Sequence, residues 1–171
     1  MKAHLILVFL IISFAGLSQM TEREQNVLDE INLCRTNPKL YMQYIDEYLI
    51  YYNSDAGEKA TARELKKKIK KMKPVEPLVF SPELYEACKL HGEYIIKTKK
   101  FVHSDCVCAE NIQYGHDDVR YAVIDLLIDY GISSRGHREN ILNPEFKHFA
   151  VYEIPQKVKK MEHIFIQQFN R

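Results

Sequence analysis

The 171-residue chain carries 24 lysine and arginine residues against 23 aspartate and glutamate residues, a formal net charge of +1 at pH 7. A charge so close to zero does not favour nucleic acid as a partner, nor a membrane attached by bulk electrostatics. Hydrophobic residues make up 46% of the chain, and a chain of this length is expected to bury one core and form one domain.

The first segment has the pattern of a secretory signal peptide. Lys2 and His4 precede a mostly apolar run, Leu5 to Leu17, and small and polar residues follow it. A membrane-spanning helix needs about 20 apolar residues, and this run is shorter. We expect 1–18 to be a signal peptide and 19–171 a single domain. The protein is then secreted, or periplasmic in a Gram-negative bacterium, monomeric, and not an integral membrane protein.

Four cysteines lie in the expected mature part: Cys34, Cys88, Cys106 and Cys108. An even count in an exported chain is compatible with a disulfide framework. Cys106 and Cys108 are separated by one residue, which we expect to strain a mutual bridge, so pairings with the other two are favoured. Two bridges, or at least two free thiols, both stay open.

The N-terminal part of this domain predicts two helices. Residues 21–35 place Thr21 and Glu24 at capping-box spacing. The apolar positions that follow share one helical face: Val27, Leu28, Ile31 and Cys34. Asn37 and Pro38 interrupt the pattern, and residues 39–52 resume it. The second apolar face consists of Leu40, Tyr44, Ile45 and Tyr48.

Residues 61–73 are strongly basic, with seven basic residues and one acidic residue between Arg63 and Lys73. Leu65, Ile69 and Met72 form a thin apolar stripe at helical spacing. The segment is either a basic amphipathic helix for an anionic surface or a solvated helix whose stripe rests on the domain. The narrow stripe favours the second interpretation.

Two further helices follow. In residues 81–97, Ser81 is suited to the N-cap and Pro82 to the first helical position. The apolar stripe of that helix contains Leu84, Cys88, His91 and Ile95, so His91 is expected to face the core. Residues 100–115 are expected to be a loop rich in polar and thiol groups. Residues 117–130 form the next helix, with Gly131 just past its end.

The stretch SSRGHRENILNP, residues 133–144, predicts a short helix capped by one of its two serines and stopped at Pro144. His137 then lies in the first turn. The helix dipole and the flanking Arg135 and Arg138 disfavour its charged form. Metal ligation and general-base catalysis both require a neutral imidazole. In the plainer interpretation, His137 merely satisfies local backbone groups.

The last part of the chain alternates between apolar and polar residues. Residues 148–154 and 163–169 are expected to form two antiparallel strands joined by a charged turn. Helices flanking a small antiparallel sheet are the predicted result.

His103 and His137 are candidate metal ligands. Together with nearby carboxylates they would make an adequate open site for zinc or a similar cation. The spacing does not establish this, since no HExxH motif occurs. Ser104 and Cys106 stand close to His103, but neighbours in sequence are seldom oriented as nucleophile and base. A cysteine hydrolase is therefore disfavoured.

Several segments in order resemble the CAP superfamily, the SCP-domain group of cysteine-rich secretory, antigen 5 and plant pathogenesis-related proteins. They are INLCRTNPKLY, SPELYEACKLHGEYI, FVHSD, AENIQYG, AVIDLLIDYG, SSRGHRENILNPEFKHFAVYE and HIFIQQF. The GHR-x-NIL segment followed by Asn-Pro is similar to the microbial branch. The resemblance covers residues 25–170. It implies an α+β fold, a three-layer α-β-α sandwich, with the lysine-rich segment 58–73 as an insertion.

The resemblance also implies a ligand cleft with two histidines and two acidic residues. These map onto His103, Glu110, Asp129 and His137, with Asp129 where the family usually has glutamate. His103 and His137 are then the candidate ligands for a divalent cation such as zinc.

The leading functional hypothesis is a non-catalytic secreted binding module whose cleft takes a divalent cation or a polar or lipid ligand. Its partner would be an extracellular protein, a lipid or a small ligand. A second hypothesis is a metal-assisted, peptidase-like hydrolase with Glu110 as general base. In a third, the cleft residues are a structural remnant that satisfy one another without a ligand.

Overall fold

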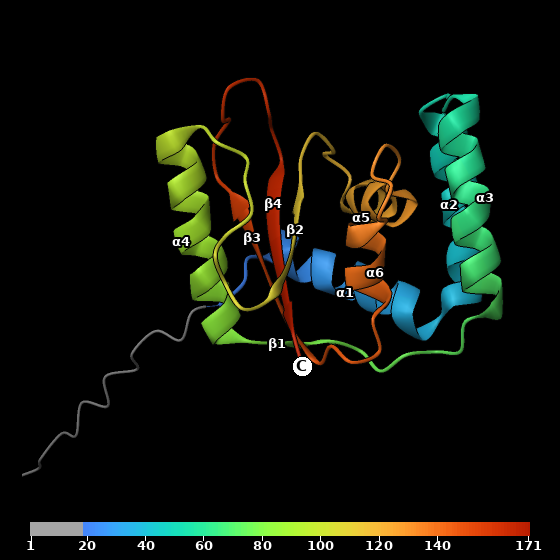
Figure 1. The fold of residues 1–171 in the computed structure, drawn as a ribbon, viewed down its shortest axis with the longest axis horizontal. Coiled ribbons are helices and arrows are strands. Elements are labelled where there is room, and N and C mark those ends of the chain that lie inside the picture. Colours follow the sequence, from blue (N-terminus) through green and yellow to red (C-terminus); the bar gives the residue numbers. More distant parts are fainter. Residues whose placement is uncertain (1–18) are drawn as a thin grey trace, which may run out of the picture.

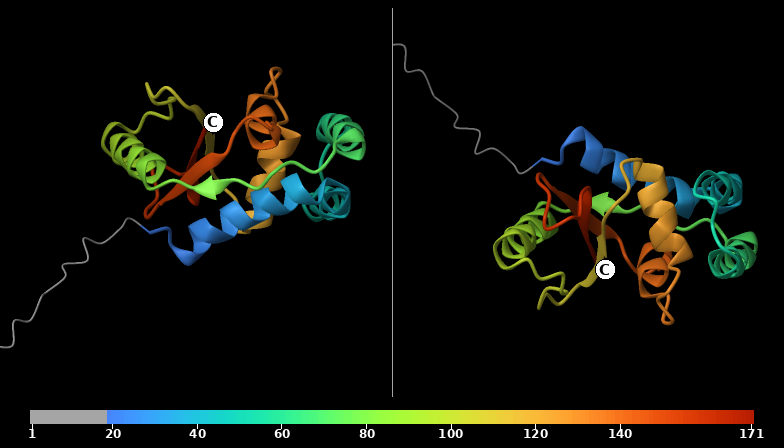
Figure 2. Two further views of the ribbon diagram at one scale, coloured as in Figure 1. Left: turned by 90° about the horizontal axis from the view of Figure 1, so that it is seen from below. Right: turned by 90° about the horizontal axis from the view of Figure 1, so that it is seen from above.

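The computed structural model describes residues 19–171, and the expected signal peptide lies outside the described residues. The described part is an α+β sandwich of three layers around a four-stranded mixed sheet (Figure 1). Helix α4 covers one face of the sheet, and α1, α5 and α6 lie on the other side with the α2–α3 hairpin beyond them (Figure 2). Residues 19–171 contain no helix with the length and apolar character needed to cross a bilayer.

The helices are α1 (Glu22–Thr36), α2 (Pro38–Tyr51), α3 (Ala56–Lys71), α4 (Pro82–Thr98), α5 (Val119–Ile128) and α6 (Gly136–Leu142). The strands are β1 (Val79–Phe80), β2 (Ala109–Gln113), β3 (His148–Ile154) and β4 (Ile164–Asn170). Their order in the sheet is β1-β3-β4-β2. The β3–β4 pair is antiparallel as expected, and β2 also pairs antiparallel with β4. The two-residue β1 runs parallel to β3 and makes the sheet mixed.

The start of α1 confirms the predicted capping box. The Thr21 hydroxyl accepts from the Glu24 backbone N–H at 3.2 Å, and the Glu24 carboxylate accepts from the Thr21 N–H at 2.7 Å. The four predicted apolar positions of this helix are all buried. Local hydrogen bonding and the apolar face therefore agree on where the helix begins and which side packs.

The lysine-rich segment forms α3, which packs antiparallel to α2. Ala62, Leu65 and Ile69 are buried in the core, so the apolar stripe of α3 rests on the domain. In α2 the buried face includes Tyr41, whereas Leu40, expected on that face, is exposed.

The core has two parts, one on each face of the sheet, and each holds a free cysteine. Cys34 lies in the cluster built by α1, α2, α3, α5 and α6, and Cys88 in the cluster under α4. Burial raises the pKa of the Cys34 thiol to about 12 and also raises the pKa of Cys88. The two thiols therefore remain protonated at neutral pH and are separated by the sheet.

The expected disulfide preference is wrong. Cys106 and Cys108 form a disulfide with each other, their Cα atoms 5.3 Å apart. That separation lies within the usual range for a bridge, so the loop accommodates the short span. The fully buried positions of Cys34 and Cys88 leave no exposed partner for the loop cysteines.

Two further expectations need correction near the site. Residues 100–115 are not loop throughout, because Ala109–Gln113 forms the edge strand β2. The short helix α6 is not capped by a serine; its N-cap is Arg135, in the left-handed region at φ 53°. Arg135 Nη1 donates to the carbonyl oxygens of Asp129 and Ile132 at 2.9 and 2.7 Å, which holds this turn in place.

Candidate functional site

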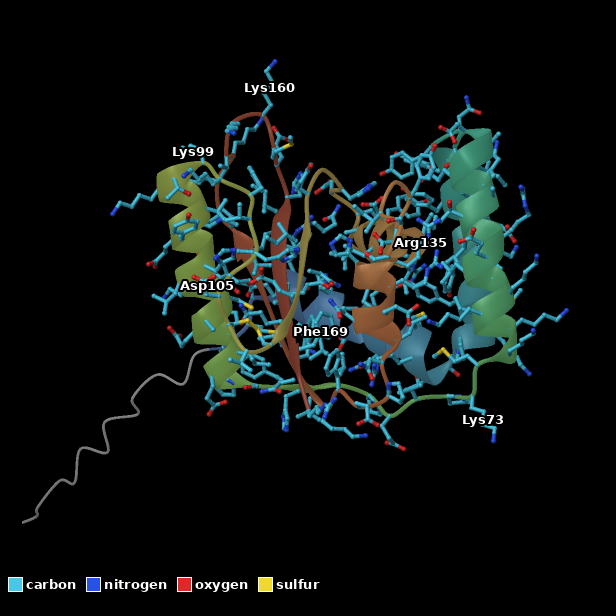
Figure 3. All side chains as sticks on the ribbon, in the orientation of Figure 1. Lys73, Lys99, Asp105, Arg135, Lys160 and Phe169 are labelled. Atoms are coloured by element: carbon cyan, nitrogen blue, oxygen red, sulfur yellow. A yellow bond between two sulfur atoms is a disulfide. The ribbon has the colours of Figure 1, made fainter. Side chains whose placement is uncertain are left out.

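The edge strand β2 separates the four predicted site residues into two pairs. Side chains alternate along a strand, so Glu110 and Asn111 point to opposite sides of β2. Glu110 lies opposite Gln168 of β4 and contacts it, and Asn111 does the same with Gln167. In Figure 3, Asp105 of the preceding loop lies toward α4 and Arg135 toward α5 and α6.

On the α4 side, the carboxylate of Glu110 accepts four hydrogen bonds. Oε1 receives the backbone N–H of Ser104 at 2.9 Å and lies 3.0 Å from His103 Nδ1. Oε2 receives the Ser104 hydroxyl at 2.7 Å and the Gln168 side-chain amide at 3.0 Å. Burial by itself would raise the pKa of Glu110, but these hydrogen bonds outweigh it and lower the pKa.

The contact with Glu110 determines which nitrogen of His103 carries a proton. A carboxylate can only accept, so Nδ1 is the protonated nitrogen, and Nε2 of the neutral ring keeps a lone pair. The His103 side chain is 61% exposed. It therefore presents an acceptor nitrogen to the outside while its other nitrogen is anchored.

His91 of α4 is buried, as the sequence predicted. Its Nε2 lies 2.8 Å from the carbonyl oxygen of Val102 and acts as the donor, because a carbonyl accepts. The same nitrogen is 3.8 Å from Glu110 Oε1. His91 therefore ties the loop that carries His103 to the helix beneath it.

A hollow of about 470 Å³ opens between α4 and this loop. It is lined by Ala87, Leu90, His91, Tyr94, Val102, His103, Ser104, Asp105, Cys106 and Gln168. Gln168 is fully buried, and its Nε2 is used by Glu110 and by the Ser104 hydroxyl at 3.3 Å. Its Oε1 has no hydrogen-bond partner. A buried amide oxygen without a donor is costly, so this polar atom beside the hollow is left unsatisfied by the fold.

On the other side of β2, Asp129 holds His137. Asp129 Oδ1 lies 2.8 Å from His137 Nδ1, and Oδ2 accepts from the backbone N–H groups of His137 at 3.0 Å and Arg138 at 3.4 Å. Asp129 ends α5 in a left-handed conformation at φ 56°, which turns its side chain toward the start of α6. The shorter acid thus reaches the histidine and also supplies the helix cap that no serine provides.

An amide network lies on the His137 side of β2. Asn111 Nδ2 donates to Gln167 Oε1 at 3.2 Å, and Asn140 Nδ2 donates to Asn111 Oδ1 at 2.9 Å. Neither Ser104, Gln168 nor these asparagines were among the predicted site residues. The available signal was the polar pair Gln167-Gln168 at buried positions of an otherwise apolar strand.

The predicted metal site on His103 and His137 stays a prediction. Within residues 19–171, no three His, Cys, Asp or Glu side chains are grouped closely enough to hold a metal ion. His103 and His137 each use Nδ1 for their own carboxylate, on different sides of β2. No step is therefore assigned to a cation.

An α-β-α domain whose histidine–carboxylate pairs flank the edge of its sheet defines a narrow class of proteins. Residues 28–169 match the family model described as CAP: Cysteine-rich secretory protein family. The chain therefore belongs to the CAP family, in agreement with the resemblance read from its segments. No curated protein matches the chain significantly in sequence.

Proposed function

We propose that this CAP-domain protein is an exported, non-catalytic binding module that takes a small ligand in the hollow beside α4. The observation that carries the proposal is that Gln168, which lines that hollow, has a buried side-chain oxygen, Oε1, without a hydrogen-bond donor. A bound ligand that supplies an N–H or O–H group would satisfy it. The complementary group is the lone pair on Nε2 of His103, which accepts a second hydrogen bond.

The apolar part of the lining determines which chemical groups the rest of the ligand must have. Leu90, Tyr94 and Val102 are exposed apolar or aromatic side chains along the same hollow. Ligand sites typically combine such a lining with a few convergent polar groups. The ligand class is therefore an amphiphilic small molecule with a hydroxyl or amide at one end and an apolar body.

The geometry of Glu110 favours binding over hydrolysis. A general base needs a free lone pair and a pKa close to the working pH. All four hydrogen bonds to Glu110 come from within the protein, and they lower its pKa. The carboxylate is thus suited to hold His103 and Gln168 in place and poorly suited to remove a proton from water.

The His137–Asp129 pair has a structural role in this proposal. Asp129 joins the end of α5 to the first turn of α6 through three hydrogen bonds, and it is buried. In this proposal, the hypothesis that the cleft residues satisfy one another without a ligand applies to the His137–Asp129 half of the predicted cleft.

Two matched substitutions test the location. Leu90→Arg places a long side chain at the hollow beside α4, and Ile132→Arg does so at a hollow of about 210 Å³ beside His137. Both residues are exposed, so the fold is expected to tolerate both changes. A panel of amphiphilic alcohols and amides is screened by ligand-observed NMR. We expect Leu90→Arg to abolish binding and Ile132→Arg to retain it; the reverse pattern would overturn the proposal.

Cation binding is tested separately. Zinc is titrated calorimetrically into the wild-type protein and into a double variant with His103→Ala and His137→Ala. We expect equal heats from both proteins, because His103 and His137 are each held by a separate carboxylate. Binding that is lost in the double variant would show that the pairs come together around a metal.

A further inference from the structure

The α2–α3 hairpin carries a basic face that the binding hollow does not use. Along α3, the cations Lys59, Arg63 and Lys70 recur at helical spacing, and Lys73 follows just beyond the helix; all four side chains are exposed. Those within the helix flank the stripe that α3 buries in the core. The hairpin stands at one end of the molecule, away from α4, with Lys73 at its lower end (Figure 3).

The charges of this face are not cancelled by its acidic neighbours. Asp46 pairs with Lys66 at 2.6 Å, and Glu64 pairs with Arg135 at 3.3 Å. Glu47 of α2 is exposed and adds a negative charge. The cations of the face belong mainly to α3, and they outnumber these three carboxylates. The near-zero net charge of the chain thus conceals a concentrated positive surface.

Two hollows lie between α2 and α3 on this face. One, of about 550 Å³, is lined by Lys59, Arg63, Lys66 and one carboxylate, Asp46, and Ile50 forms part of its wall. The other, of about 430 Å³, is bordered by Lys39, Lys70, Lys71 and Lys73, and Leu40 forms part of its wall. Each hollow therefore combines several cations with apolar side chains, of which Ile50 and Leu40 are exposed.

The two apolar side chains are exposed without a partner in the described fold. Ile50 is 80% exposed and Leu40 is 44% exposed, at opposite ends of α2. A hydrophilic polyanion has no apolar surface against which Ile50 and Leu40 could pack. A bilayer offers phosphate groups for the cations and, just beneath them, the acyl boundary for the apolar groups.

We propose that this face docks the protein onto an anionic phospholipid bilayer. Lipid phosphates occupy the two hollows, and Leu40 and Ile50 reach into the interfacial region. The stripe of α3 remains in the core, so the hairpin lies on the surface as a folded unit and does not insert as an amphipathic helix. This surface is separate from the hollow beside α4 and does not depend on the ligand proposed there.

The test is co-sedimentation of the purified protein with vesicles, either pure phosphatidylcholine or phosphatidylcholine with about one-third phosphatidylglycerol. We expect binding to the anionic vesicles only, weakened by salt. Each cation near such a surface contributes about fivefold in affinity, so Lys59→Gln, Arg63→Gln and Lys70→Gln together should weaken binding by roughly 100-fold. The control is Lys97→Gln, Lys100→Gln and Lys160→Gln, which removes three exposed charges elsewhere and should leave binding unchanged.

A second variant separates a bilayer from a soluble polyanion. Leu40→Ser with Ile50→Ser keeps every charge and should weaken vesicle binding several-fold while leaving retention on heparin unchanged. An equal loss of vesicle binding in the two triple variants, or vesicle binding that the serine variant does not weaken, would overturn the proposal. In the latter case the face would be a binding surface for a hydrophilic polyanion.

Discussion

Replacing Asp129 by alanine removes the connection between α5 and α6. The carboxylate of Asp129 is buried and accepts from the ring and the backbone N–H of His137 at 2.8 and 3.0 Å, and from the N–H of Arg138 at 3.4 Å. Alanine leaves these donors without an acceptor at the start of a seven-residue helix that has no other side-chain cap. It also occupies a left-handed position, φ 56°, that favours aspartate and asparagine.

The expected cost follows from these contacts. Loss of a helix cap costs about 1 kcal/mol. Loss of a hydrogen bond to a charged group costs about 1.5–3 kcal/mol, and alanine in the left-handed region adds about 1 kcal/mol. We therefore expect Asp129→Ala to lower the free energy of unfolding by about 4 kcal/mol. For a domain of this size the midpoint temperature falls by roughly 10 °C.

Asp129→Asn is the matched control, because asparagine keeps an acceptor oxygen and tolerates the left-handed backbone. We expect it to lose about 1–2 kcal/mol, since the charge is removed but the cap remains. Urea and thermal unfolding of the three proteins provide the measurement. A loss below about 1 kcal/mol for Asp129→Ala, or equal losses for both variants, would refute the structural role.

Three further results are expected. Because folding lowers the pKa of Glu110, the ionised carboxylate stabilises the folded protein above the ordinary value of 4.5, and this contribution is lost as the pH falls below it. The difference in unfolding free energy between the wild-type protein and Glu110→Gln, measured by urea titration, should therefore narrow as the pH falls past 4.5. A thiol reagent should label the native protein only after reduction of Cys106–Cys108, whereas prior labelling of the buried thiols would contradict their burial. Gly92→Ala should cost about 1–3 kcal/mol, since the new Cβ would lie 2.7 Å from the Tyr152 ring; an unchanged melting temperature would show that this ring moves freely.

Periodicity and capping were sufficient to predict most of the fold. The helices and the two long strands appear where apolar spacing and caps agree, as at Thr21 and Ser81, because these signals act within a few residues. The family resemblance supplied the layer architecture, which local patterns alone left as helices around a sheet.

The remaining features depend on partners that are distant in sequence. β1 and β2 are short, and their pairing with β3 and β4 makes them strands. The cap of α6 comes from Asp129 at the end of α5, so no motif within α6 predicts it. The Cys106–Cys108 bridge depends on a loop conformation that spacing alone did not predict.

The site could be predicted in part. The four residues implied by the resemblance do form contacts, Glu110 with His103 and Asp129 with His137. Their division into two pairs follows from the alternation of side chains along β2, a strand that was not predicted. Gln168 was missed because two polar residues in an otherwise apolar strand do not indicate a site until the unpaired oxygen of Gln168 is seen.

The most direct test of the account is a chemical-shift map of the protein saturated with the tightest amphiphilic ligand from the screen. The account predicts that the side-chain amide of Gln168 and the ring of His103 shift together with Leu90 and Tyr94, because the ligand donates to Oε1 of Gln168. It also predicts that the ring of His137 does not shift. A map centred on His137, with Gln168 unchanged, would contradict the assignment of the ligand site to the hollow beside α4.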